Sequence, residues 1–180
     1  MKVRIGGIND NDVVNGEGVS VSLFTQGCPH HCKNCFNPES WDFNGGIEME
    51  DSDVVKIIAE KLTANGVQRN LSFLGGEPLA DENINLVASI ISYVLWNLDY
   101  APKIYIWTGY TLEELSERAD ENINLDYILT HTDALIDGPY VDELKDLTLH
   151  LRGSSNQRIL NKQEIEAGLL FTRNKIFDII

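Results

Sequence analysis

Three cysteines lie within eight residues of one another, as Cys28, Cys32 and Cys35, and the sequence contains no others. The odd number, the tight C-x3-C-x2-C spacing and the lack of a distant cysteine argue against a disulfide framework. Thiolates do hold iron–sulfur clusters, and a [4Fe–4S] cube contains four irons. Three cysteines would leave one iron without a protein ligand, as catalytic zinc sites leave one position open. The spacing therefore predicts a [4Fe–4S] cluster with a free iron, where a substrate or cofactor can bind.

The cysteine loop has two other interpretations. Structural zinc prefers four ligands, and His30 or His31 could supply the fourth. Such zinc sites usually combine two separated ligand pairs, however, and the sequence offers no second pair. The thiols could also be inert. A non-catalytic zinc or iron–sulfur binding module is therefore the alternative function from a different class.

Further candidate residues follow short apolar runs. Gly75-Gly76-Glu77-Pro78 combines glycines, which allow close backbone approach, with a carboxylate that can bind a cationic amine. Alone, this segment is explained equally well as a strand-to-helix turn. Thr108 could contact a ribose or a carboxylate, and Asp137 could contact a cofactor, or each could belong to a turn. The polar segment 152–158 is a solvated loop, a carboxylate-binding loop or a contact with a partner protein.

Strand and helix signals alternate along the chain. Strands are predicted over residues 19–26, 70–74, 103–107 and 133–136. Helices are predicted from Asp51 or Ser52, over residues 87–98, and from Thr111, which has Glu114 at capping-box spacing. After residue 146 the pattern predicts a strand followed by a polar loop, and the docking of 161–180 is left open.

This alternation implies a fold of the α/β class, with a parallel sheet and right-handed crossovers. Ligands of such sheets bind beyond the carboxyl ends of the strands. The cysteine loop, GGEP, Thr108-Gly109-Tyr110 and Asp137-Gly138-Pro139-Tyr140 each follow one predicted strand. We therefore expect these four loops to converge on one site.

Length and charge narrow the function classes. The 180 residues fit a single domain, 1–180. The net charge of -14, from 28 acidic and 14 basic residues, disfavours nucleic-acid binding, because that depends on Lys and Arg neutralising phosphates. The sequence has no apolar stretch of about 18 residues and no secretory signal, so we expect no membrane span and a cytoplasmic location.

Six segments together resemble the activating proteins of anaerobic ribonucleoside-triphosphate reductase, a glycyl-radical-enzyme activase family of the radical-SAM superfamily. The cysteine spacing resembles the superfamily, and the later segments resemble this family in its order. The segments are VVNGEG at 13–18, FTQGCPHHCKNCFNPESWD at 24–42, FLGGEPL at 73–79, IWTGY at 106–110, LIDGPY at 135–140 and LRGSSNQR at 151–158.

The resemblance implies a small, open, partial (β/α) barrel of mostly parallel strands, of the radical-SAM type. It also implies that S-adenosyl-L-methionine binds the free iron and is cleaved by one electron to methionine and a 5′-deoxyadenosyl radical. That radical would abstract a hydrogen from a glycine of the reductase and form a glycyl radical. The protein would then be a radical-SAM oxidoreductase whose partners are the large reductase subunit and an external, flavodoxin-like electron donor.

The resemblance also assigns residues to the cofactors. Cys28, Cys32 and Cys35 would bind the [4Fe–4S] cluster, and the cofactor-derived radical, not a side chain, would accept the hydrogen. The expected contacts with S-adenosyl-L-methionine are Asn34, Cys35 and Phe36 at the adenine, Gly75, Gly76 and Glu77 at the methionine end, and Thr108.

Three positions depart from the family pattern. Asn34 replaces a residue that is often aromatic in the superfamily, and Glu77 stands where relatives often have Asp. The NGEG loop lacks the proline and the following arginine that are common there. Within the superfamily, the alternative is another small radical-SAM enzyme or an activase of a different glycyl-radical enzyme.

Overall fold

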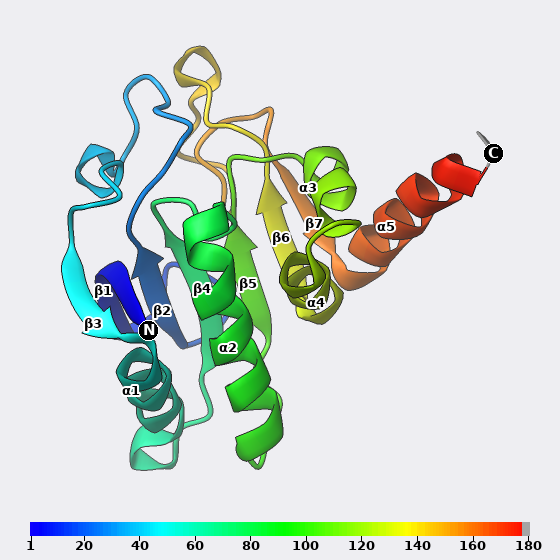
Figure 1. Cartoon of the computed structure of the whole chain (residues 1–180). Coiled ribbons are helices and arrows are strands. Elements are labelled where there is room, and N and C mark those ends of the chain that lie inside the picture. Colours follow the sequence, from blue (N-terminus) through cyan, green and yellow to red (C-terminus); the bar gives the residue numbers. More distant parts are fainter. Residues whose placement is uncertain (178–180) are drawn as a thin grey trace.

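The computed structural model describes the backbone of residues 1–177 and the side chains of residues 1–171. This part of the chain forms an open α/β structure in which seven strands make one sheet, in the order β3-β1-β2-β4-β5-β6-β7 (Figure 1). The strands are β1 Lys2–Asp12, β2 Ser20–Thr25, β3 Ile47–Glu50, β4 Asn70–Gly75, β5 Ile104–Trp107, β6 Ala134–Asp137 and β7 Arg158–Asn161. The α-helices are α1 Asp51–Thr63, α2 Asp81–Asn97, α3 Leu112–Ala119, α4 Ile123–His131 and α5 Lys162–Phe177.

The four predicted strands form the centre of the sheet. β2, β4, β5 and β6 pair in parallel, as the alternation of strands and helices predicted. The outer strands run the other way: β1 pairs antiparallel with both β2 and β3, and β7 pairs antiparallel with β6. The α/β class is thus confirmed, and the sheet does not close on itself, but it is mixed, and the prediction of mostly parallel strands is wrong for its edges.

The edge strands are the elements that the sequence did not predict. β1 contains two adjacent glycines and ends in Asn and Asp residues, which are depleted in strands, and β3 is only four residues long. Both form because a ladder of backbone hydrogen bonds to a neighbour is available. The strand predicted just after residue 146 is wrong: residues 147–157 are turns and a single bridge, and β7 follows the polar loop instead of preceding it.

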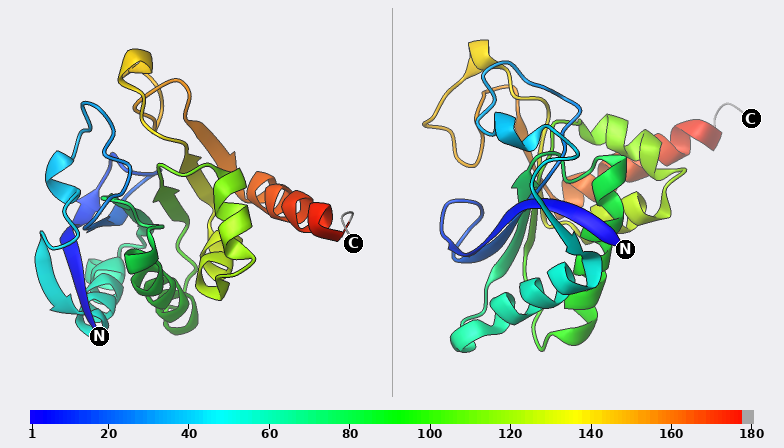
Figure 2. Two further views of the ribbon diagram at one scale, coloured as in Figure 1. Left: turned by 45° about the horizontal axis from the view of Figure 1, so that its top comes forward. Right: turned by 60° about the vertical axis from the view of Figure 1, so that its left-hand side comes forward.

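Helices α1, α2 and α4 cover one face of the sheet (Figure 1). The apolar stripe that predicted α2 is buried against it, with Val87, Ile90, Ile91 and Val94 fully inaccessible. On the other face lies the β1–β2 connection, drawn in blue in the right-hand view of Figure 2. There, a Cβ added to Gly16 would lie 3.0 Å from Ser20 Oγ. One face of the sheet therefore carries the helical core, and the other is covered by loops.

The C-terminal segment docks through the start of α5. Ile165 and Leu169 are buried, and the helix packs against α3 and α4, while its later turns extend away from the sheet (Figure 1). The prediction about 161–180 also includes residues 178–180, which lie outside the described residues. Within the described part, no helix combines the length and apolar character required to span a bilayer.

Candidate functional site

The loops after β2, β4, β5 and β6 line one cavity of about 440 Å³, which is within the usual size range of small-molecule sites. The prediction that four loops converge is confirmed. The sequence-predicted residues on its wall are Cys28, Cys32, Cys35, Phe36, Gly75, Gly76, Glu77 and Thr108. The β1–β2 connection, through Val14 and Asn15, and the segment 147–153 complete the wall.

The cysteine loop is held by the segment that follows it. The amide of Gly27 donates to Ser40 O at 2.8 Å, and that of Cys28 donates to Trp41 O at 3.1 Å. Gly27 has a φ of +91°, and a Cβ there would lie 2.0 Å from the Phe43 ring. Only glycine fits this position, because the close ring and the positive φ both exclude a side chain. The loop therefore enters the cavity along a fixed path.

Cys28 is buried, whereas Cys32 and Cys35 are half-buried. Burial raises the pKa of Cys28 to about 11 and also raises the pKa of Cys32, and a metal would replace the proton of each thiol that it binds. Among the described side chains, no three His, Cys, Asp or Glu groups converge as they would around a single ion. A cube needs a wider arrangement, because each cysteine binds its own iron. Cys28, Cys32 and Cys35 all line the cavity, and the cluster stays the prediction for this loop.

The backbone conformation at position 34 explains why an asparagine is found there. Its φ is +55°, a left-handed conformation that asparagine adopts more readily than most residues. Its side chain donates to Asp142 Oδ2 at 2.8 Å, and this hydrogen bond lowers the pKa of Asp142. Phe36 lies on the cavity wall, with its ring centroid 5.2 Å from that of Tyr140. Of the predicted adenine contacts, Cys35 and Phe36 thus line the cavity, while the Asn34 side chain is directed to Asp142.

The glycines of GGEP allow the end of β4 to lie against the end of β2. Gly75 has a φ of +102°, and a Cβ there would be 2.8 Å from Phe24 Cα. A Cβ on Gly76 would be 2.4 Å from Gly27 O. The amide of Glu77 then donates to Gly27 O at 2.8 Å. These contacts bring the carboxylate of Glu77 next to the cysteine loop.

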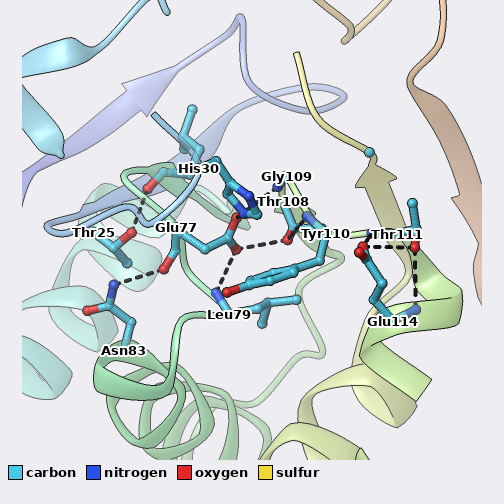
Figure 3. A network of polar contacts seen from close by, with 12 residues as sticks. Thr25, His30, Glu77, Leu79, Asn83, Thr108, Gly109, Tyr110, Thr111 and Glu114 are labelled. Carbon is cyan, nitrogen blue, oxygen red and sulfur yellow. Dashed lines mark hydrogen bonds and ion pairs between the residues drawn. The ribbon is translucent and has the colours of Figure 1, made fainter. Parts of the chain in front are cut away.

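The Glu77 carboxylate accepts four hydrogen bonds and is only 1% exposed (Figure 3). Oε1 accepts from Leu79 N at 2.9 Å and from Thr108 Oγ1 at 2.8 Å. Oε2 accepts from Gly109 N at 2.8 Å and from His30 Nε2 at 2.9 Å. A carboxylate offers about four acceptor positions, so all of them are filled by the protein. The cofactor contacts expected of Glu77 and Thr108 stay predictions, and both side chains here connect the loops.

Asp137 also ends a strand, but unlike Glu77 it is not one of the residues that line the cavity. It is fully buried, accepts from Leu112 N at 2.8 Å, and is bound through both carboxylate oxygens by Arg158. Arg158 in turn donates to Glu113 at 2.7 and 3.0 Å, and the two acids raise the pKa of the guanidinium. The sequence offered Asp137 as a cofactor contact or a turn residue. Its hydrogen bonds connect α3, β6 and β7.

The segment 152–158 contributes Arg152, Gly153 and Gln157 to the cavity wall. Arg152 and Gly153 line the wall, and a Cβ on Gly153 would lie 3.0 Å from the Phe36 ring. Gln157 fastens the segment by accepting from Gly153 N at 2.9 Å and donating to Gly138 O at 3.1 Å. These contacts favour a loop that takes part in the site over a merely solvated loop. The choice between a cofactor and a partner protein stays open.

Sequence reasoning missed two features of the site. The carboxylate of Asp12 accepts from Val14 N and Asn15 N, at 2.8 and 3.0 Å, and so shapes the β1–β2 connection. Burial opposes ionisation of Asp12, but its hydrogen bonds outweigh burial and lower its pKa. The second feature is the contact of His30 with Glu77. An Asx-turn spacing signals the first, whereas no local pattern signals the second.

Comparison with known proteins agrees with this site. A family model described as a 4Fe-4S single cluster domain matches residues 14–160. This match identifies the class as proteins with a single 4Fe–4S cluster domain. The anaerobic ribonucleoside-triphosphate reductase-activating proteins of Vibrio cholerae and Haemophilus influenzae are 38% and 36% identical, over 82% of this chain and 91% of their own lengths. The activating protein of Enterobacteria phage T4 is 33% identical, over 82% of this chain and 87% of its own length. The chain belongs to the family of anaerobic ribonucleoside-triphosphate reductase-activating proteins.

Proposed function

We propose that this protein activates an anaerobic ribonucleotide reductase as a radical-SAM enzyme, with a partial-barrel site that is open to a protein substrate. The observation that carries the proposal is that Cys28, Cys32 and Cys35 lie on one cavity wall with GGEP and Thr108. Three thiolates suit a [4Fe–4S] cluster with one free iron. The cavity extends beyond them to aromatic and apolar side chains, which suit a nucleoside.

When bound, a reduced cluster would supply the electron that cleaves S-adenosyl-L-methionine to methionine and a 5′-deoxyadenosyl radical, and that radical would take a hydrogen atom from a glycine Cα of the reductase, giving 5′-deoxyadenosine and a glycyl radical. The electron comes from an external donor of the flavodoxin class. The protein contributes binding and orientation to this chemistry.

The residues of this chain have separate parts in that arrangement. The three cysteines would bind the cluster, and the backbone at Cys35 and the ring of Phe36 would face the adenine. Gly75 and Gly76 would hold the loop at the methionine end close to β2 and the cysteine loop, because a side chain at either would collide with Phe24 or Gly27. Phe36 is 54% exposed at the edge of the site, so it can also exclude water once the reductase covers the cavity.

The first experiment tests the cluster. After anaerobic reconstitution we expect about four irons and four sulfides per chain, and formation of 5′-deoxyadenosine when dithionite and S-adenosyl-L-methionine are added. The matched control replaces all three cysteines by alanine. This variant should fold, because the apolar core consists of other residues, and should bind no iron. Stoichiometric zinc without 5′-deoxyadenosine would support the non-catalytic module instead.

The second experiment tests the partner. The reconstituted protein is incubated with the large reductase subunit, S-adenosyl-L-methionine and reductant, and frozen for EPR spectroscopy. We expect a glycyl radical signal that depends on all three additions. Formation of 5′-deoxyadenosine with no glycyl radical on the reductase would keep the radical-SAM activity and refute this substrate. An activase of another glycyl-radical enzyme would then be the better assignment.

A further inference from the structure

His30 is a cysteine-loop residue whose side chain reaches the ends of two other strands. Its Nε2 lies 2.9 Å from Glu77 Oε2, and because a carboxylate can only accept, Nε2 is the donor. Its side chain is 18% exposed and lines the cavity. Glu77 follows β4 by two residues, so this contact joins the loops after β2 and β4.

The imidazole is also confined on its other sides (Figure 3). A Cβ on Gly109 would lie 2.4 Å from His30 Cδ2, so glycine at 109 leaves the space that the ring occupies. Tyr110 packs against it edge-on, with ring centroids 4.5 Å apart. The turn after β5 thus forms a slot for the His30 ring. The Gly109 amide and His30 Nε2 both donate to Glu77 Oε2.

The four donors to Glu77 differ in what they connect. Leu79 N belongs to the same loop as Glu77, while Thr108 Oγ1 and Gly109 N join that loop to the end of β5. Among these four donors, His30 alone comes from the segment between Cys28 and Cys32. Losing it would leave the other three bonds in place and would free the segment between Cys28 and Cys32 from the Glu77 carboxylate, while the Glu77 amide still donates to Gly27 O.

We propose that His30 is a positioning residue: its hydrogen bond to Glu77 fixes the cysteine loop relative to the ends of β4 and β5, and thereby sets how a cluster on the three cysteines faces the cofactor. The inference rests on the proposed function, since it concerns that cluster and S-adenosyl-L-methionine. Residues that orient metal ligands without touching the metal commonly matter for function. Their mutation lowers metal affinity or activity about 10- to 100-fold.

The test compares two amides that differ in reach. In His30→Gln the side-chain NH2 can occupy the position of Nε2 and donate to Glu77, whereas in His30→Asn the shorter side chain cannot. His31→Asn is the matched control, because His31 is an exposed histidine of the same loop, packed at a tilt against Trp41, and its φ of +48° suits asparagine. All proteins are reconstituted anaerobically, and their iron content and thermal unfolding are measured.

Two further measurements do not depend on turnover. They are the affinity for S-adenosyl-L-methionine by equilibrium dialysis and the change that this cofactor causes in the EPR spectrum of the reduced cluster. We expect His30→Asn to retain iron but to bind the cofactor at least about tenfold more weakly, with a smaller spectral change. His30→Gln should be within about threefold of the wild type, and His31→Asn should match it.

Equal behaviour of His30→Gln and His30→Asn would overturn the proposal, whether both keep or both lose affinity, because the reach of the donor would then not matter. An effect of His31→Asn as large as that of His30→Asn would also overturn it. Failure of the wild-type protein to bind the cofactor would refute the proposed function itself, and is seen before any variant is compared.

Discussion

Glu77 and Asp137 are two buried carboxylates at the ends of central strands of the same sheet, yet the protein compensates their charges differently. Asp137, after β6, is paired with the guanidinium of Arg158 and lies between α3 and β7. Glu77, after β4, is surrounded by two amides, a hydroxyl and an imidazole, and lies on the wall of the cavity.

The difference separates structural stability from construction of the site. In an ion pair such as that of Asp137, one partner neutralises most of the negative charge. Loss of that partner therefore leaves an uncompensated charge in the protein interior. Four separate donors divide the compensation of Glu77 among three loops. Removing one of them costs less, but it alters the position of a loop that carries site residues.

The largest effect is expected for Arg158→Met. This change leaves Asp137 buried with the Leu112 amide as its described donor, and should lower the free energy of unfolding by about 3–5 kcal/mol. Urea denaturation measures the loss. Iron content after reconstitution should stay at the wild-type value under conditions where the variant is folded. A folded variant that no longer binds iron would show that the Asp137 pair also supports the site, as Glu77 does.

The next largest effect on stability is expected for Glu77→Gln. The amide keeps one acceptor oxygen but turns an NH2 group toward the two donors that bind the other oxygen, which should cost about 2 kcal/mol in urea denaturation. In contrast to Arg158→Met, this variant should also lose affinity for S-adenosyl-L-methionine. Unchanged affinity together with lowered stability would mean that Glu77 is no more connected to the site than Asp137.

Thr108→Val sharpens the comparison by removing one donor to Glu77. The Thr108 hydroxyl donates to Glu77 Oε1 at 2.8 Å and accepts from Tyr110 N at 3.1 Å, so its loss should lower the free energy of unfolding by about 1 kcal/mol. Thr108→Ser is the control, because it keeps the hydroxyl. Unchanged stability of Thr108→Val would mean that the hydroxyl contributes nothing, whereas a loss in Thr108→Ser would measure the methyl group, which valine retains.

The smallest effect is expected for Glu113→Gln. Glu113 is 67% exposed, so its pair with Arg158 should contribute less than about 1 kcal/mol. The hydrogen bond from Arg158 lowers the pKa of Glu113, so this contribution is complete above the ordinary glutamate pKa of 4.5 and is lost as pH falls through the lowered value. Thermal unfolding of wild type and variant should therefore differ slightly at neutral pH and converge in acid. A difference that grows in acid would contradict this assignment.

Much of the central fold could be predicted from local patterns. The apolar stripe of α2, the four parallel strands and the capping box of Thr111 and Glu114 are all present. The edge strands could not be predicted, because a strand needs a partner as well as a suitable composition. β1 forms despite its glycines because it pairs along β2, whereas the alternating residues 147–151 have a strand-like pattern but form turns.

The sequence by itself determined which chemical groups are present and after which strands they come: three thiols in one loop, a glycine-rich turn with a carboxylate, and a threonine–glycine turn. These signals lie within a few residues and follow from side-chain chemistry and backbone conformation. Only the tertiary structure decided the partners of the two acids. His30 and Glu77 are 47 residues apart, and Asp137 and Arg158 are 21 apart. Such contacts depend on which strands pair and in what register, and no local pattern encodes that.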